Sequence, residues 1–178
     1  MTRRLTAGLP VARQRGFTLV EVLVSSLVLG IGLVGVAGLQ ALSLKNTQSA
    51  FMRSQATAMA YDLADRMRSN VAGALGGSYV PASANKVPGC TTTAGCTPEE
   101  IAQNDLAEWL AAIDNNLPAG EGFVCIDSTP DDGTGSGDPQ CDGAGTEFAI
   151  KIWWDDDRDG QISVTPDNME RFAAIVQL

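Results

Sequence analysis

An acidic turn near the end of the chain has the residue types and the spacing of a calcium-binding loop. Asp155, Asp157 and Asp159 occupy the first, third and fifth positions of an EF-hand loop, and Gly160 occupies the sixth. The twelfth position holds Pro166, where that loop requires a glutamate that binds through both carboxylate oxygens. The turn also follows a predicted strand and not a helix. We therefore expect an acidic hairpin turn without a cofactor, with bound Ca²⁺ as the alternative.

Four cysteines in the second half of the chain have the chemistry of disulfides or of a metal site. They are Cys90, Cys96, Cys125 and Cys141. An even number of cysteines in an exported, loop-rich domain favours two disulfides, and the sequence leaves three connectivities open. A zinc site of four thiolates fits less well, because neither pair has the gap of about two to four residues that zinc ligands usually show.

The charge and the lack of histidine restrict the classes of function. The 178 residues include no histidine, which removes the commonest general base and the Ser-His type of triad. Beyond residue 16 the chain has eight basic and twenty-one acidic residues, a net charge of −13. Such a surface argues against nucleic-acid binding, which needs clustered Lys and Arg. We expect no enzyme; a membrane-anchored enzyme or calcium-binding receptor is the alternative from another class.

A long uncharged stretch dominates the organisation of the chain. Residues 22–44 carry no charge, and a helix of that length spans roughly 35 Å, enough for the core of a bilayer. Residues 1–16 hold four arginines and no acid, which is typical of a signal that stays cytoplasmic. Ordinary secretory signals lose their apolar stretch on cleavage. Here the candidate site, between Gly16 and Phe17, precedes that stretch, so cleavage would remove only the leader.

The helical pattern continues past the membrane stretch. Apolar side chains recur on one helix face at spacings of three and four: Met52, Ala56, Met59, Leu63 and Met67. No proline interrupts residues 11–80, and glycines 73, 76 and 77 supply the stop. We expect a leader over 1–16, a helix over 17–72 with its membrane segment at 17–44, and a head domain over 73–178. The apolar face of the helix must be covered by the head.

The head should contain one more helix and a small sheet. A Thr-x-x-Glu capping box at Thr97 and Glu100, with Pro98 in the first turn, predicts the start of the helix. Its buried stripe should be Ala102, Leu106, Trp109, Leu110 and Ile113. We predict three strands, at residues 123–127, 147–154 and 171–178. The predicted class is α+β, a long N-terminal hydrophobic helix packed on a small antiparallel sheet with a second short helix.

The string RGFTLVE at residues 15–21 resembles the amino-terminal signature of type IV prepilins and of the pseudopilins of type II secretion. The resemblance implies a pilin-like fold, cleavage between Gly16 and Phe17 by a prepilin peptidase, and methylation of the new Phe17 amine. It also implies that Glu21 neutralises the amino terminus of a neighbouring subunit during assembly. The alternative for Glu21 is an interfacial residue that faces lipid headgroups.

Looser motifs in the head resemble minor pilins of the PilV type. They are AMAYDLADRMRSN at 58–70, TPEEIAQNDLAEW at 97–109 and FAAIVQL at 172–178. This resemblance implies a protein held in the bacterial inner membrane with its head in the periplasm, then moved into an extracellular pilus. Its partners would be other minor and major pilins, the prepilin peptidase and the inner-membrane pilus assembly machinery, in a complex that starts or tips the fibre. A pseudopilin of type II secretion is the alternative.

Two groups of residues on the long helix each allow two interpretations. The first group lets helices approach closely in lipid or is merely tolerated there: Gly30, Gly32, Gly35 and Gly38. The second group either binds neighbouring subunits or forms a solvated face: Arg66, Arg68 and Asn70.

Overall fold

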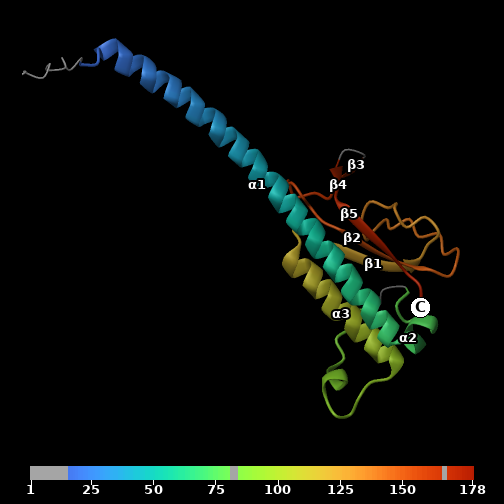
Figure 1. Ribbon diagram of the computed structural model, residues 1–178. Coiled ribbons are helices and arrows are strands. Elements are labelled where there is room, and N and C mark those ends of the chain that lie inside the picture. Colours follow the sequence, from blue (N-terminus) through green and yellow to red (C-terminus); the bar gives the residue numbers. More distant parts are fainter. Residues whose placement is uncertain (1–15, 81–83, 166–167) are drawn as a thin grey trace, which may run out of the picture. The chain divides into compact units, whose positions relative to one another are not determined.

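The computed structural model describes residues 16–80, 84–165 and 168–178 (Figure 1). The chain divides into two compact units between Lys45 and Asn46. The first helix, α1 (Leu19–Ser69), contributes to both units. The predicted α+β class is confirmed, with a long helix that is apolar at its start and a small antiparallel sheet. Of the predicted leader, only Gly16 lies within the described residues.

The long helix ends at Ser69, earlier than predicted, and the cause is a polar side chain and not a glycine. Asn70 leaves the helical conformation and caps the short helix α2 (Val71–Leu75), its side-chain oxygen accepting from the Gly73 amide at 3.3 Å. Its amide group donates to the Pro98 carbonyl at 2.7 Å. Asparagine side chains compete in this way for backbone groups and so favour helix ends. Contrary to the prediction, the glycines therefore do not end α1, but Gly76 caps the end of α2.

Helix α3 (Pro98–Asn116) begins as predicted. Thr97 Oγ1 accepts from the Glu100 amide at 3.2 Å, while a Glu100 carboxylate oxygen accepts from the Thr97 amide at 2.8 Å. This reciprocal pair satisfies two N–H groups that the helix itself leaves unbonded. The buried stripe is confirmed except at Leu110, which is half-buried and packs on the edge of the core. A short 3₁₀ helix, η1 (Pro88–Thr91), precedes α3 and was not predicted.

Three antiparallel strands form the sheet in the order β1-β2-β5: β1 (Glu121–Ile126), β2 (Phe148–Trp153) and β5 (Arg171–Val176). In the middle of the sheet, Val124 of β1 pairs with Ile150 of β2, and Ile150 pairs with Ala174 of β5. The three predicted strands are confirmed with ends displaced by one or two residues. A further two-stranded hairpin was not predicted: β3 (Val164–Thr165) with β4 (Asn168–Met169).

The core of the second unit lies between the helices and one face of the sheet (Figure 1). Alternate residues of β2 face the helices, because side chains of a strand point to opposite sides in turn. The second half of α1 contributes six buried residues: Met52, Ala56, Ala60, Leu63, Ala64 and Met67. Gly122 of β1 lies so close to α3 that an added Cβ would come within 2.6 Å of Trp109. Glycine is therefore required where this strand meets the helix.

A long loop covers the other face of the sheet. This covering loop (residues 127–146) joins β1 to β2 and contacts strand residues that point away from the helices. Lys151 donates to the Asp132 carboxylate at 2.6 Å, and Trp153 Nε1 donates to the Gly133 carbonyl at 3.4 Å. Arg171 of β5 donates to the same carbonyl at 2.8 Å. All six residues of β2 are consequently buried, although the sheet has only three strands.

Candidate functional site

The amino-terminal segment places a carboxylate in the first turn of α1. Gly16 and Phe17 lie before the helix, and the Phe17 side chain is 84% exposed. Thr18 Oγ1 accepts from the Glu21 amide at 3.3 Å, as an N-cap side chain does. Glu21 is exposed in the first turn, where the helix carries a partial positive charge. The part of the predicted signature that the structure describes, residues 16–21, thus lies at the start of the helix.

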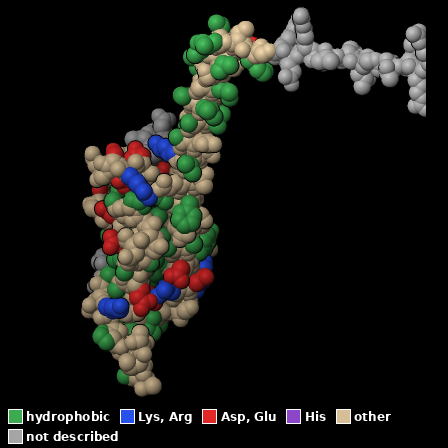
Figure 2. Space-filling view, turned by 90° about the vertical axis from the view of Figure 1, so that its left-hand side faces the viewer, with side chains coloured by type: hydrophobic (Ala, Val, Ile, Leu, Met, Phe, Trp, Pro, Cys, Tyr) green, Lys and Arg blue, Asp and Glu red, His purple; other side chains and the backbone are tan. Residues whose placement is uncertain are grey.

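The stretch of α1 that follows is apolar and unburied. Among the described residues, α1 is the one helix long and apolar enough to cross a membrane, with a mean hydropathy of 2.4 in its most apolar window. Figure 2 shows hydrophobic side chains along this stretch and charged side chains gathered over the second unit. Two hydroxyl groups within it bond to carbonyls of their own helix, Ser25 to Glu21 at 2.7 Å and Ser26 to Leu23 at 2.9 Å. They therefore need no further partner in lipid.

Four glycines in this stretch make no close contact within the chain. A Cβ added at any of them would have no heavy atom within 4 Å, other than the local helix: Gly30, Gly32, Gly35 and Gly38. The chain itself therefore does not require glycine there. Close packing against a neighbouring helix stays a prediction for these positions.

Arg66 is bound within the chain and not left for a neighbour. Its guanidinium pairs with Asp62 one turn earlier at 2.9 Å and with Glu108 of α3 at 2.9 Å. It also lies 3.3 Å from Asp105. The hydrogen bond from Arg66, followed by one from Asn104, lowers the pKa of Glu108 below its usual value. These pairs hold α3 against α1.

The other two residues of that group differ from each other. Arg68 is exposed and pairs with Asp65 at 2.9 Å, so it lies on a solvated face. Asn70 is buried as the cap of α2, and the prediction that it is a surface residue is wrong. Its side chain is not available to a partner.

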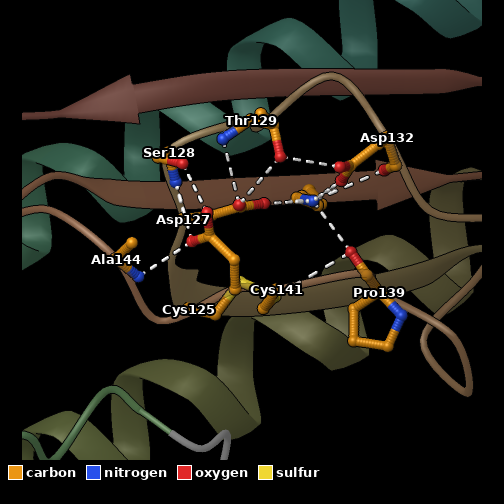
Figure 3. Close-up of a disulfide and its surroundings, with 10 residues drawn as sticks. Cys125, Asp127, Ser128, Thr129, Asp132, Pro139, Cys141 and Ala144 are labelled. Atoms are coloured by element: carbon orange, nitrogen blue, oxygen red, sulfur yellow. Dashed lines mark hydrogen bonds and ion pairs between the residues drawn. A yellow bond between two sulfur atoms is a disulfide. The ribbon is translucent and has the colours of Figure 1, made fainter.

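The cysteines form two disulfides, one of the three connectivities that the sequence left open. Cys90 pairs with Cys96, which closes the loop before α3. Cys125 of β1 pairs with Cys141, which fastens the covering loop to the sheet (Figure 3). A zinc site is therefore not formed, because no cysteine is free. Closing a loop of this length stabilises a fold by about 3 kcal/mol in the loop-entropy model.

The acidic turn gathers two of the three predicted carboxylates. Asp155 and Asp157 come together with Glu170, one carboxylate oxygen of each lying within 4.8 Å of the others, whereas Asp159 does not belong to this group. Asp155 is buried, and its two oxygens accept from the amides of Arg158 at 2.7 Å and Gly160 at 2.8 Å.

Glu170 is a member of this group that the sequence did not indicate. It is buried and accepts from the amides of Asp156 at 3.2 Å and Ser163 at 2.5 Å. The antiparallel register, which places Arg171 opposite Trp153, brings it beside the turn. These bonds to backbone amides order an acidic turn, but the turn is not that of a hairpin, because β2 pairs with β5 and the next strand, β3, pairs with β4. Bound Ca²⁺ stays the untested alternative to a turn without a cofactor.

Asp142 orders the covering loop and should make the stability of the head depend on pH. Side-chain and backbone hydrogen bonds from Ser128, with one from the Ala144 amide at 2.8 Å, lower the pKa of Asp142 to about 2. Because the folded pKa lies below the unfolded value of about 3.9, its contribution is present above about pH 4 and is lost as the pH falls towards about 2. Asp142→Asn should therefore flatten this part of the pH dependence.

The midpoint of urea unfolding, followed for the full chain in detergent between about pH 5 and about pH 2.5, measures this effect. Asp114→Asn, which changes an exposed aspartate of α3, serves as the matched control and should keep the wild-type profile. Identical profiles for the wild type and Asp142→Asn would contradict the assignment.

Lys151 is the other residue that sequence reasoning missed. Its side chain has no exposure, and its ammonium group lies 2.5 Å from the equally buried Asp127. The available signal was a single lysine in the apolar strand FAIKIWW, since a charge in a central strand needs a buried partner. The identity of that partner depends on how the covering loop folds back.

Two family models match the chain. A model of the prokaryotic N-terminal methylation motif matches residues 11–37, and a model described as type IV pilin Tt1218 matches residues 38–107. The two matches adjoin and include α1, α2 and the first half of α3. Comparison with curated proteins and with solved structures gave no significant match.

Proposed function

Because the chain belongs to the type IV pilin family, we propose that it is a minor pilin that acts by assembly and not by catalysis. A prepilin peptidase cuts it between Gly16 and Phe17, and the Phe17 amine is methylated. The protein is then held in the bacterial inner membrane by residues 17–44 with its head in the periplasm. From there it joins other minor pilins and the major pilin in a complex that starts or tips the fibre.

The observation that carries this proposal is the unburied apolar stretch of α1 directly behind the signature. Sixteen large hydrophobic residues between Phe17 and Leu44 are each more than half exposed. Burying one such side chain is worth about 1.5–3 kcal/mol, so the set represents more than about 20 kcal/mol of unfavourable contact with water. Lipid would bury these side chains before assembly, and the helices of neighbouring pilins would bury them in the fibre.

The position of Glu21 supports a role in the assembled state. Removal of the leader would free an amine at Phe17, one turn before Glu21. A carboxylate in a membrane segment is costly, about 3 kcal/mol at the centre of a helix and less towards an end. In a fibre, a neighbouring subunit's amino terminus would neutralise the charge of Glu21 and thereby favour one axial stagger between subunits.

The minor-pilin assignment rests on the looser head motifs, and a pseudopilin of type II secretion is the alternative. The two share every feature of the first unit. Deleting the gene, with and without a plasmid copy, and scoring surface fibres against secreted exoproteins separates them. We expect fibres to be lost and restored by the plasmid, with secretion unchanged. Loss of secretion with normal fibres would overturn the minor-pilin assignment in favour of the pseudopilin.

A further inference from the structure

A buried lysine lies against a buried aspartate on the outer face of the sheet, beneath the covering loop. Lys151 is at the centre of β2, and Asp127 follows the end of β1. Neither side chain has any exposed surface, and Lys151 Nζ lies 2.5 Å from Asp127 Oδ2. Figure 3 shows the surroundings of Asp127, with the Cys125–Cys141 disulfide beside it. Amine and carboxyl are thus held together away from water.

The two oxygens of Asp127 have different surroundings. Oδ1 accepts from the Thr129 amide at 3.1 Å and from the Thr129 hydroxyl at 3.4 Å. Oδ2 is buried and, among the described residues, has the Lys151 ammonium as its polar neighbour and no hydrogen bond. One oxygen is therefore held by donors while the other faces the amine.

A second carboxylate shares the same ammonium group. Asp132 Oδ1 lies 2.6 Å from Lys151 Nζ, and the carbonyl of Pro139 lies 2.8 Å from it. The Thr129 hydroxyl donates to Asp132 Oδ2 at 2.8 Å and so touches both carboxylates. Burial raises the pKa of Asp132, but hydrogen bonds from Lys151 and Thr129 lower it overall. Asp132 is therefore ionised, and its Oδ1 is in direct contact with the ammonium group.

We propose that Lys151 and Asp127 join in an amide bond within the folded head. Asp132 takes a proton from the ammonium group, and the freed Nζ lone pair attacks Cγ of Asp127. The new Nζ–Cγ bond forms and one Cγ–O bond breaks. The departing oxygen leaves as water with the two protons that nitrogen gives up, one transferred directly and the other returned by Asp132. Ammonium and carboxylate thus become one amide and one water molecule, with no oxidant or reductant.

Three features of the site favour this step. Holding the reacting groups at contact distance replaces a bimolecular encounter by a unimolecular step. Complete burial of Lys151 and Asp127 disfavours their charged forms relative to a neutral amide. The Thr129 amide is aimed at Oδ1, where negative charge develops as nitrogen attacks. Asp132 is the less suitable acceptor of the bond, because 38% of its side chain is exposed.

The bond would give the covering loop a fastening that does not depend on redox conditions. The Cys125–Cys141 disulfide already ties the loop to β1. An amide between Asp127 and Lys151 would join the end of β1 to the centre of β2. The turn-rich loop between them would then stay on the sheet even in a reducing environment.

Mass spectrometry of the mature full-length protein, purified in detergent and fully reduced, tests the proposal. We expect a mass lower by one water molecule than that calculated for residues 17–178 with one N-methyl group. Digestion with a protease that cleaves after glutamate locates the amide bond. Glu147 lies between the two residues, so cleavage there separates Asp127 from Lys151 in the sequence. Peptides 122–147 and 148–170 should then appear as one joined species. An unmodified mass with two separate peptides would show an ion pair only and overturn the proposal.

Variants test the roles of the individual residues. Lys151→Arg and Asp127→Ala should both restore the full mass. Asp131→Asn is the matched control, since Asp131 lies in the same loop but pairs at 2.8 Å with Arg171, and should keep the mass deficit. Asp132→Asn should lower the joined fraction measured at a fixed time after synthesis. An unchanged fraction in that variant would overturn the role of Asp132 as proton acceptor.

Discussion

Replacing Glu21 with alanine is expected to reduce incorporation into fibres about a hundredfold while leaving cleavage and methylation intact. In the assembled state the change would leave the neighbouring amine without its counter-charge in an apolar environment. Leaving one member of a buried ion pair unpaired costs about 3–5 kcal/mol, and a hundredfold loss corresponds to about 2.8 kcal/mol. The effect should therefore be among the largest of any single substitution in the first unit.

Quantifying the protein in sheared fibres relative to the membrane fraction measures this effect. Mass spectrometry of the membrane fraction should still find N-methylated Phe17 at the amino terminus. Ser25→Ala is the matched control, since this hydroxyl lies one turn further along and donates to the Glu21 carbonyl of its own helix. Incorporation of Glu21→Ala at the wild-type level would exclude a charge-pairing role.

Trp109→Ala should lower the free energy of unfolding of the head by about 3–5 kcal/mol. Trp109 is 1% exposed in the middle of the core, and its Nε1 donates to the Met59 carbonyl at 3.0 Å. The substitution removes the ring that fills the space between α1, α3 and Gly122, and it leaves that carbonyl without its donor. Because domains are typically stable by about 5–15 kcal/mol, this loss would be a large fraction of the total.

Urea unfolding of the full chain in detergent, followed by near-ultraviolet circular dichroism, measures the loss. Trp109→Phe keeps part of the ring volume and should lose less stability. Leu75→Ala changes a side chain that is 74% exposed and should alter stability by less than about 0.5 kcal/mol. A loss below about 1 kcal/mol for Trp109→Ala would show that the core is not organised around this ring.

Elements that depend on local signals could be predicted from the sequence. The start of α3 follows from Thr97, Pro98 and Glu100, whose side chains and ring act within one turn. The three long strands follow from short apolar runs bounded by turn residues. The apolar stretch and its signature are likewise local, because a membrane segment is defined by its own composition.

Elements that depend on long-range contacts could not be predicted. Asn70 ends α1 partly by bonding to Pro98, which lies 28 residues away. The burial of Lys151 depends on the covering loop, whose glycines, aspartates and prolines indicated only turns. Glu170 reaches the acidic turn through the pairing of β5 with β2, and the sequence predicted strands but not their order. In each case the sequence shows the residue but does not show which distant part of the chain it contacts in the fold.

The order of the strands makes the central strand β2 depend on residues 171–176 for one of its two edges. Strand β5 pairs with one side of β2, and it is the last strand along the chain among the residues that the structure describes. A chain that stops before Arg171 would leave the whole backbone edge of FAIKIW unpaired. Unpaired apolar edges recruit strands from other molecules and lead to aggregation. A nonsense mutation at the Arg171 codon, which removes β5, should therefore be as damaging to this protein as an early one, through aggregation and loss of the product.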